Sequence, residues 1–231
     1  MIIKSDPKKL LLRQLNSFYN FEEFDMRCED NHEIKAIDKV YQSVLNKLDY
    51  CFNHINNKYY HNNGETIFNP LHVGQWTMFL YQIAHQIKLD SNDNTDLCDK
   101  IYGIGKCFSS ADIFYEVNMP NIWFFDHPQG SVMGRALYSD FFSFSQGCTV
   151  GNNRGKYPIF DKHVTMMSGS KVLGNCRIGN HVIIAANAYV IDRDIPPYTI
   201  VFGEGVGQQL HRISPEKFSE LTGSMFDGKE L

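Results

Sequence analysis

The sequence predicts an α+β protein, in which an α-helical N-terminal domain is followed by a parallel β-helix of hexapeptide repeats. A change of pattern along the chain supports this. In the first hundred residues apolar side chains recur every three or four positions, which is the spacing of a helix face. From about residue 130 a six-residue period takes over. That period is typical of a β-helix in which each repeat supplies one short strand and one turn.

The helical pattern is clearest over residues 37–55, where apolar side chains line one face. A second helix is expected over 71–89, and the mixed first 30 residues are assigned to helix as well. A third helix is expected later in the same domain, after a polar and turn-prone stretch.

That polar stretch covers residues 90–96 and precedes the third helix, which is expected over 97–108. Thr95 or Asp96 is expected to cap this helix, because a short oxygen-bearing side chain can accept from its first free backbone N–H groups. The predicted domains are a helical domain over 1–108, a β-helix over 109–205 and a C-terminal tail over 206–231.

Two positions of the hexapeptide define the inside of the predicted β-helix. A large apolar residue fills the interior, and a small or β-branched residue four positions later fits where the walls converge. The large residues are Val132, Tyr138, Phe144, Val150, Phe160, Met166, Val172, Ile178, Ile184 and Val190. The small residues are Val164, Ser170, Cys176, Val182 and Ala188. An evenly spaced β-sandwich is the alternative, which so many positions in register disfavour.

The repeat has marked corners and one interruption. Gly174-Asn175 and Gly179-Asn180 allow a backbone with positive φ at two corners. Pro196-Pro197 is expected to end the repeat, because proline cannot donate to a sheet ladder. The step from Val150 to Phe160 is ten residues instead of six, so four residues are inserted there.

Composition restricts the class of function. The chain has 231 residues, 43% of them hydrophobic, and a net charge of −4, so it is neither disordered nor a general nucleic-acid binder. The N-terminus lacks the apolar core of a signal peptide, and no stretch predicts a membrane helix. Six cysteines without a CxxC motif predict reduced, buried thiols in a cytoplasmic protein. They are Cys28, Cys51, Cys98, Cys107, Cys148 and Cys176.

Asp126 and His127 are the first candidates for chemistry. They follow the apolar run Trp123-Phe-Phe125. Histidine suits proton transfer because its ordinary pKa lies near neutrality, and a carboxylate usually orients it. Asp112, fifteen residues upstream, is a candidate for that carboxylate. In the alternative interpretation His127 is a surface histidine in a turn.

The insertion at 151–158 is the second candidate, because a loop that breaks a strict repeat favours a function. Its glycines, with Arg154 and Lys156, could approach an anionic cofactor; otherwise the loop is an inert turn. His163 and His181 lie one coil apart and suggest a metal site. We disfavour that site and expect two exposed corner histidines, since zinc needs three or four ligands and their column holds no third His or Cys.

Several short motifs resemble those of the serine acetyltransferases, a branch of the hexapeptide acyltransferases with a helical N-terminal domain and a left-handed β-helix. The resemblance covers roughly residues 70–205. The motifs are Tyr81-Gln-Ile-Ala-His85, Ala111-Asp-Ile113, Phe125-Asp-His127, Gln146-Gly-Cys-Thr-Val-Gly151, Val172-Leu-Gly-Asn175 and Ile195-Pro-Pro-Tyr198. This resemblance implies a left-handed β-helix and an acetyl-CoA-dependent O-acetyltransferase that needs no metal ion.

The resemblance also implies roles for individual residues. His127 would be the general base, Asp112 the carboxylate that orients it, and Asp126 a contact of the acceptor. CoA would lie in a groove between neighbouring subunits of a homotrimer or a dimer of trimers. The residues whose backbone amides reach CoA would be Gly151, Asn152, Ser168 and Ala186.

One position departs from the family pattern. Before Pro158 this chain has Lys156-Tyr157, where the family has an Arg-His pair that helps to hold the carboxylate of serine. Lysine keeps the charge but loses the bidentate fork of arginine. The end of the chain, Gly228-Lys-Glu-Leu231, also differs from the terminal isoleucine that docks the family's sulfhydrylase partner. A hydroxyl of a surface-glycan sugar is therefore as good a candidate acceptor as L-serine.

Two other classes of protein are compatible with the sequence. The first is a non-catalytic hexapeptide scaffold, which would need no protonatable group and is disfavoured by Asp112, Asp126 and His127. The second is a metal-dependent hydratase of the same fold, which is disfavoured by the missing third metal ligand.

Overall fold

The computed structural model describes residues 1–19, 31–223, 225 and 226. The chain divides into two compact units. The helical unit comprises Met1–Asn53, Tyr59–Ser109 and Ile113–Glu116, and the solenoid unit comprises His54–Lys58, Ser110–Asp112 and Val117–Leu231. Part of the predicted N-terminal helix, Cys28 and the C-terminal residues 228–231 lie outside the described residues.

The helical unit confirms the helices that apolar spacing predicts. Leu15, Phe52 and Phe79 are 0% exposed in the core, and residues 75–85 are buried on every side of their helix. No helix among residues 1–19, 31–223, 225 and 226 is long and apolar enough to cross a membrane. The helices are α1 (Pro7–Tyr19), α2 (His32–Asn53), α3 (Val73–Asp90) and α4 (Thr95–Ser109).

The predicted cap of α4 is wrong. Neither Thr95 nor Asp96 precedes the helix, because α4 already begins at Thr95. A short 3₁₀ turn, η1 (Asn92–Asn94), leads directly into it. Ser91 caps that turn instead, accepting at Oγ from the backbone N–H of Asp93 at 3.0 Å. The capping oxygen therefore lies one turn upstream of the predicted position.

The helical unit also contains a small sheet that periodicity does not predict. Its strands are β1 (Ile2–Ile3), β3 (Glu65–Phe68) and β2 (His61–Asn62), in that order across the sheet. Asn63 and Gly64 form the hairpin between β2 and β3, with φ of 52° and 86°. An Asn-Gly pair is the usual sequence signal for such a turn, so local turn chemistry could have predicted this hairpin.

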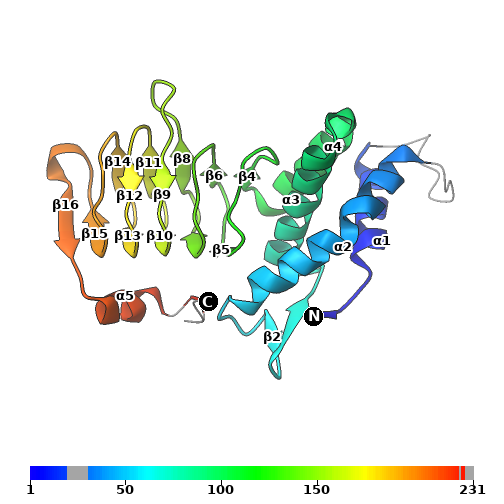
Figure 1. Cartoon of the computed structure of the whole chain (residues 1–231), viewed down its shortest axis with the longest axis horizontal. Coiled ribbons are helices and arrows are strands. Elements are labelled where there is room, and N and C mark those ends of the chain that lie inside the picture. The colour runs from blue at the N-terminus through cyan, green and yellow to red at the C-terminus, as the bar shows by residue number, and fades with distance from the viewer. Residues whose placement is uncertain (20–30, 224, 227–231) are drawn as a thin grey trace. The chain divides into compact units, whose positions relative to one another are not determined.

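The solenoid unit is a parallel β-helix, whose strands lie side by side in Figure 1. Its walls have the strand orders β16-β15-β13-β10-β7-β5, β14-β11-β8-β6-β4 and β12-β9. The pairs β10–β13, β11–β14 and β9–β12 are parallel, whereas β15 and β16 are antiparallel. The strands are β4 (Asp112–Ile113), β5 (Trp123–Phe125), β6 (Val132–Met133), β7 (Phe142–Phe144), β8 (Thr149–Gly151), β9 (Ile159–Phe160), β10 (Val164–Met166), β11 (Lys171–Leu173), β12 (Arg177–Ile178), β13 (Val182–Ile184), β14 (Tyr189–Ile191), β15 (Thr199–Phe202) and β16 (Gln209–Arg212).

The interior of the solenoid confirms the hexapeptide pattern downstream of the insertion. The large residues there are each 0% exposed, and the small residues are at most 3% exposed. The pairing of Val164 with Val182 and of Val172 with Val190 places equivalent residues in adjacent coils. The large buried residues are Phe160, Met166, Val172, Ile178, Ile184 and Val190.

Upstream of the insertion the predicted register is wrong at Val132. Val132 is 40% exposed, whereas Met133 is 1% exposed and pairs with Val150 in the ladder. Since side chains alternate between the two faces of a strand, a shift of one residue turns Val132 outward. The step from the inward Met133 to Tyr138 is therefore five residues instead of six, and the ring of Tyr138 stacks on that of Phe160 at 5.3 Å.

The corners confirm one prediction and correct two others. Gly174 has the expected positive φ, at 80°, whereas at the Gly179-Asn180 corner His181 has it instead, at 59°. Gly179 has a different role, because a Cβ there would lie 2.6 Å from Pro197 N. The prolines do not end the repeat: β15 follows them and pairs with β13.

After β15 the chain turns back on the solenoid. A 3₁₀ turn, η2 (Gly205–Gly207), precedes the antiparallel β16, and the helix α5 (Pro215–Thr222) follows. Ser214 caps α5 at its start, and Gly223, with φ of 59°, ends it. Phe218 of α5 is 6% exposed and lies edge-on to the ring of His181, 5.0 Å away.

The cysteines are free thiols in the described residues, and most of them are buried. Burial raises the pKa of Cys98 to about 11 and that of Cys176 to about 12, so both stay protonated at neutral pH. Cys176 fills a small-residue position of the repeat. Cys107 is exposed, so the prediction of a buried thiol is wrong for that residue.

Candidate active site

The turns after β5, β7, β10 and β13 stack on one another and form one edge of the solenoid, here called the His127 corner. The backbone ladder shows the stacking: Asp126 N donates to Phe144 O at 3.1 Å, and Ser145 N donates to Met166 O at 3.0 Å. The next rung continues with Met167 N donating to Ile184 O at 2.9 Å. Residues of successive turns therefore align along this corner.

His127 lies in the first of these turns, which is longer than the next one. Asp126 to Gly130 takes two residues more than Ser145 to Gly147, although Gly147 N still donates to Gln129 O at 3.0 Å. His127 has a φ of 49°, and its side chain is 77% exposed. The imidazole is therefore open to a substrate instead of filling the core.

Asp126 lies directly beside this imidazole. Its side chain is 63% exposed, and Oδ1 is 3.6 Å from His127 Nε2. Because both groups face solvent, each is also open to a third molecule.

The structure brings the segment of Asp112 to the turn that carries His127. Asp112 N donates to Ser131 O at 2.8 Å, and Gly130 N donates to Ser110 O at 3.0 Å. The strand β4 that contains Asp112 is the neighbour of β6, which directly follows this turn. Both predicted catalytic residues thus belong to one patch of backbone in the solenoid unit.

The four predicted CoA contacts lie at two different corners. Ser168 is half-buried and Ala186 is exposed, and both belong to the His127 corner. Gly151 ends β8, and Asn152 follows it at the start of the inserted loop. One chain therefore places two of these residues with His127 and the other two with the insertion.

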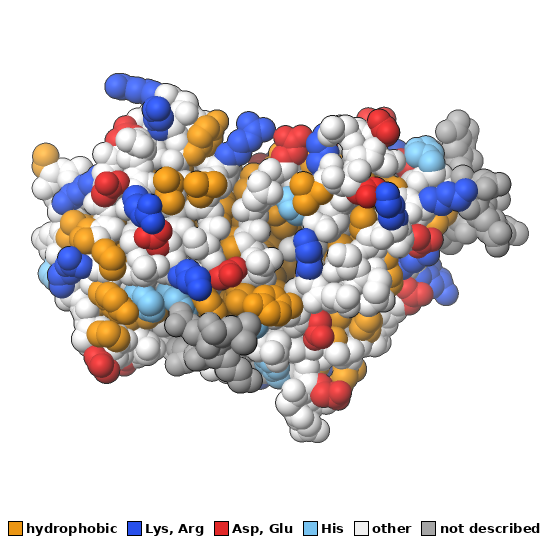
Figure 2. All heavy atoms as spheres, in the orientation of Figure 1, with side chains coloured by type: hydrophobic (Ala, Val, Ile, Leu, Met, Phe, Trp, Pro, Cys, Tyr) orange, Lys and Arg blue, Asp and Glu red, His pale blue; other side chains and the backbone are white. Residues whose placement is uncertain are grey.

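The insertion forms a tight hairpin. Asn153 and Lys156 exchange both backbone hydrogen bonds, at 3.0 and 2.9 Å. Arg154 and Gly155 form the turn, with positive φ of 50° and 74°. Figure 1 shows this loop projecting beyond the strands, and Figure 2 shows basic side chains at its tip. The hairpin presents Lys156 as exposed and Tyr157 as 42% exposed.

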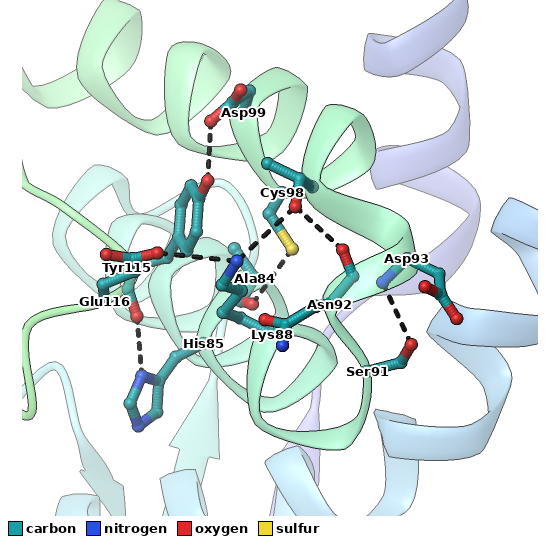
Figure 3. Close-up of polar contacts among 11 residues, drawn as sticks. Ala84, His85, Lys88, Ser91, Asn92, Asp93, Cys98, Asp99, Tyr115 and Glu116 are labelled. Carbon is teal, nitrogen blue, oxygen red and sulfur yellow. Dashed lines mark hydrogen bonds and ion pairs between the residues drawn. The ribbon is translucent and has the colours of Figure 1, made fainter.

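Within the helical unit, the segment that follows Asp112 in sequence is held on α3 and α4 (Figure 3). Tyr115 O accepts from His85 Nδ1 at 2.7 Å, and Tyr115 OH donates to Asp99 Oδ1 at 2.7 Å. Burial lowers the pKa of His85, which favours a neutral ring with its proton on Nδ1, since a carbonyl only accepts. Lys88 adds an ion pair with Glu116 at 3.5 Å. This gives a structural role to His85 of the Tyr-x-Ile-x-His motif.

His163 and His181 are neither exposed nor arranged to bind a metal. Their rings stack at 4.5 Å in a column with Phe141 and Tyr198, and Phe218 lies edge-on to both. The prediction of two exposed corner histidines is therefore wrong: both are half-buried in an aromatic column. Among residues 1–19, 31–223, 225 and 226, no group of three or more His, Cys, Asp or Glu could hold a metal ion.

Comparison with known proteins identifies relatives by sequence. No family model matches the chain. The serine acetyltransferase of Staphylococcus epidermidis is 31% identical over 165 residues, which cover 69% of this chain and 73% of that protein. The serine acetyltransferase of Staphylococcus aureus is 31% identical over 137 residues, covering 57% of this chain and 63% of that protein.

Solved structures share the fold. The serine acetyltransferase from Vibrio cholerae has a TM-score of 0.70 at 18% identity, covering 95% of this chain and 81% of that one. That of Neisseria gonorrhoeae in complex with serine has a TM-score of 0.66 at 20% identity, covering 90% and 84%. A serine acetyltransferase in complex with CoA has a TM-score of 0.64 at 20% identity, covering 89% and 83%.

The fold, together with these relatives, defines a hexapeptide-repeat acyltransferase. The identity and the coverage shared with the Staphylococcus epidermidis protein identify the family. The chain belongs to the serine acetyltransferase family.

Proposed function

We propose that this protein transfers the acetyl group of acetyl-CoA to a hydroxyl group, with His127 as the general base. The exposed imidazole at the His127 corner, in a chain of this family, is the observation that carries the proposal. His127 takes the proton of the acceptor hydroxyl as its oxygen attacks the thioester carbonyl carbon. The C–S bond then breaks, and His127 returns the proton to the sulfur.

Asp112 and Asp126 have separate roles in this proposal. Asp112 orients the imidazole of His127, because the backbone of its strand is bonded to the same turn. Asp126 contacts the acceptor beside the base. Binding and orienting the two substrates supply the rest of the rate enhancement, so no residue of the chain needs to form a covalent intermediate.

Acetyl-CoA is proposed to lie along residues with little or no side chain. A relative of the same fold was solved with CoA, and the residues proposed here leave the backbone accessible. Ala186 is exposed and Ser168 is half-buried, and Gly151 has no side chain. Asn152 follows Gly151 at the second corner. All the residues proposed for catalysis and for CoA binding therefore lie within residues 109–205. The enzyme is proposed to act in the cytoplasm.

Two acceptors are proposed, and the residues of the inserted hairpin bear on the choice between them. Serine is the first, because the relatives are named serine acetyltransferases and the structure of one similar protein was solved in complex with serine. The second is a hydroxyl of a surface-glycan sugar. It is favoured by Lys156-Tyr157, because lysine binds a carboxylate as a point charge without the paired hydrogen bonds of arginine.

Thiol release from acetyl-CoA measures both possibilities directly. We expect turnover with serine or with members of a sugar and glycan panel, and none without an acceptor. Lys156→Arg is the matched variant: it should lower the KM for serine if serine is the acceptor, and should not improve a neutral sugar. Absence of CoA release with any acceptor would rule out the proposed activity.

We also propose that the protein forms a closed homotrimer or a dimer of trimers. Large apolar side chains face outward from the solenoid, with Leu137 68%, Val132 40% and Ile191 40% exposed. Light scattering is expected to give three or six chain masses. Leu137→Glu should lower that mass, because it replaces the most exposed of these apolar side chains with a charged one. A wild-type monomer at micromolar concentration would contradict the proposal.

A further inference from the structure

The inserted hairpin is tied to a distant part of the solenoid by one carboxylate. Asp192 Oδ2 accepts from the side-chain Nδ2 of Asn153 at 2.6 Å. Its other oxygen, Oδ1, accepts from the backbone N–H of Asn175 at 2.7 Å. The carboxylate of Asp192 therefore joins residues of three successive coils. It lies 39 residues after Asn153, the first residue of the hairpin, and Asn175 belongs to the coil between them.

Gly174 makes this contact possible. It lies in the coil between Asn153 and Asp192, and its N–H donates to Gly151 O at 3.0 Å. A Cβ on Gly174 would collide with Asp192 Oδ1 and would lie 2.8 Å from the Cβ of Asn153. Its φ of 80° also favours glycine. The missing side chain thus leaves room for the two polar groups to meet across the corner.

The hydrogen bond between Asn153 and Asp192 is suited to fix the orientation of the hairpin. A hydrogen bond from an amide to a carboxylate is charge-assisted and short, hence stronger than a neutral one. The hairpin itself is closed by the two backbone bonds between Asn153 and Lys156. Its exit is fixed where Leu137 N donates to Pro158 O at 3.0 Å. The hydrogen bond between Asn153 and Asp192 therefore holds the first residue of the hairpin through side chains.

We propose that Asn153 and Asp192 are positioning residues, which hold the hairpin so that Lys156 and Tyr157 face the acceptor. This inference rests on the proposed function, because it assigns acceptor binding to that hairpin. Neither residue needs to touch a substrate. Their effect should therefore fall on the KM of the acceptor and leave kcat unchanged.

A swap of the two side chains tests the proposal. Asn153→Asp places two carboxylates against each other and is expected to raise the acceptor KM about tenfold, the scale of one charged hydrogen bond. Adding Asp192→Asn restores an amide–carboxylate pair with the roles exchanged, since the oxygen of the introduced amide can still accept from Asn175 N. The double variant is expected to recover most of the wild-type KM.

Limited trypsin digestion supplies a readout that does not depend on catalysis. Trypsin cleaves after Arg154 and Lys156, so a hairpin released from Asp192 should be cut faster. Asn153→Asp is expected to accelerate cleavage at these bonds, and the swapped double variant to slow it again. Asp161→Asn is the matched control, because it breaks an exposed ion pair with Arg177 elsewhere on the solenoid. It should change neither readout.

The outcomes separate the two proposals. If wild type turns over an acceptor but Asn153→Asp leaves its KM and the trypsin pattern unchanged, the positioning role is wrong. The same holds if the double variant is no better than Asn153→Asp alone. If wild type releases no CoA with any acceptor, the proposed function fails and this inference fails with it.

Discussion

Replacing His127 with asparagine is expected to lower kcat/KM for acetyl transfer by about 10²–10⁴-fold, the usual contribution of a general base. Asparagine is chosen over alanine because His127 has a φ of 49°, a region in which asparagine is common. The fold should be unaffected, since the side chain is 77% exposed. Thiol release from acetyl-CoA, followed over a series of acceptor concentrations that extends well below KM, measures the loss.

Two further variants show whether the loss is specific. His211→Asn removes another exposed imidazole, on β16, and should leave the rate unchanged. Asp112→Asn keeps the shape of the side chain but not its charge, and a smaller loss than for His127→Asn is expected. If His127→Asn retains activity within about tenfold, the imidazole does not act as the base, because general-base catalysis contributes more than that.

Replacing Phe160 with alanine is expected to destabilise the protein by about 3–5 kcal/mol, which is typical of truncating a buried phenylalanine. Phe160 is 0% exposed and lies in the solenoid interior. Its ring stacks on Tyr138 at 5.3 Å and lies 5.2 Å from that of Phe142. Neighbouring coils are held by their ladder bonds, so they cannot collapse fully into the space that the ring leaves.

Denaturant unfolding monitored by circular dichroism measures this loss. Val206→Ala is the control, because Val206 lies fully exposed in η2 and its truncation should change stability by less than about 0.5 kcal/mol. A loss below about 1 kcal/mol for Phe160→Ala would contradict close packing around this ring, since even a single core methylene has a larger effect than most surface changes.

Sequence reasoning predicted most of the fold because its signals are local. A helix repeats its apolar face every few residues, and α2 and α3 follow from that spacing alone. The inward positions from Phe160 to Val190 follow from the strict six-residue step. Where the step slips by one residue, between Met133 and Tyr138, the same reasoning assigned the wrong face to Val132.

The candidate site was predicted in part. Residue types pointed to Asp112, Asp126 and His127, and the ladder brings the segments of Asp112 and His127 together. The extra length of the His127 turn could have been found by counting residues against the next repeat. The roles of Asn153 and Asp192 could not be predicted, because these two residues lie 39 residues apart and share no motif.

The sequence by itself determined that the C-terminal half is a solenoid, and it determined which side chains fill the solenoid from Phe160 onward. The reason is that strand alternation and turn length act within each hexapeptide. Only the tertiary structure decided what the corners do. It places His163 and His181 in an aromatic column against α5, and it ties the hairpin to Asp192 across Gly174. Such contacts depend on which coils stack and where the chain returns, and no local period contains that information.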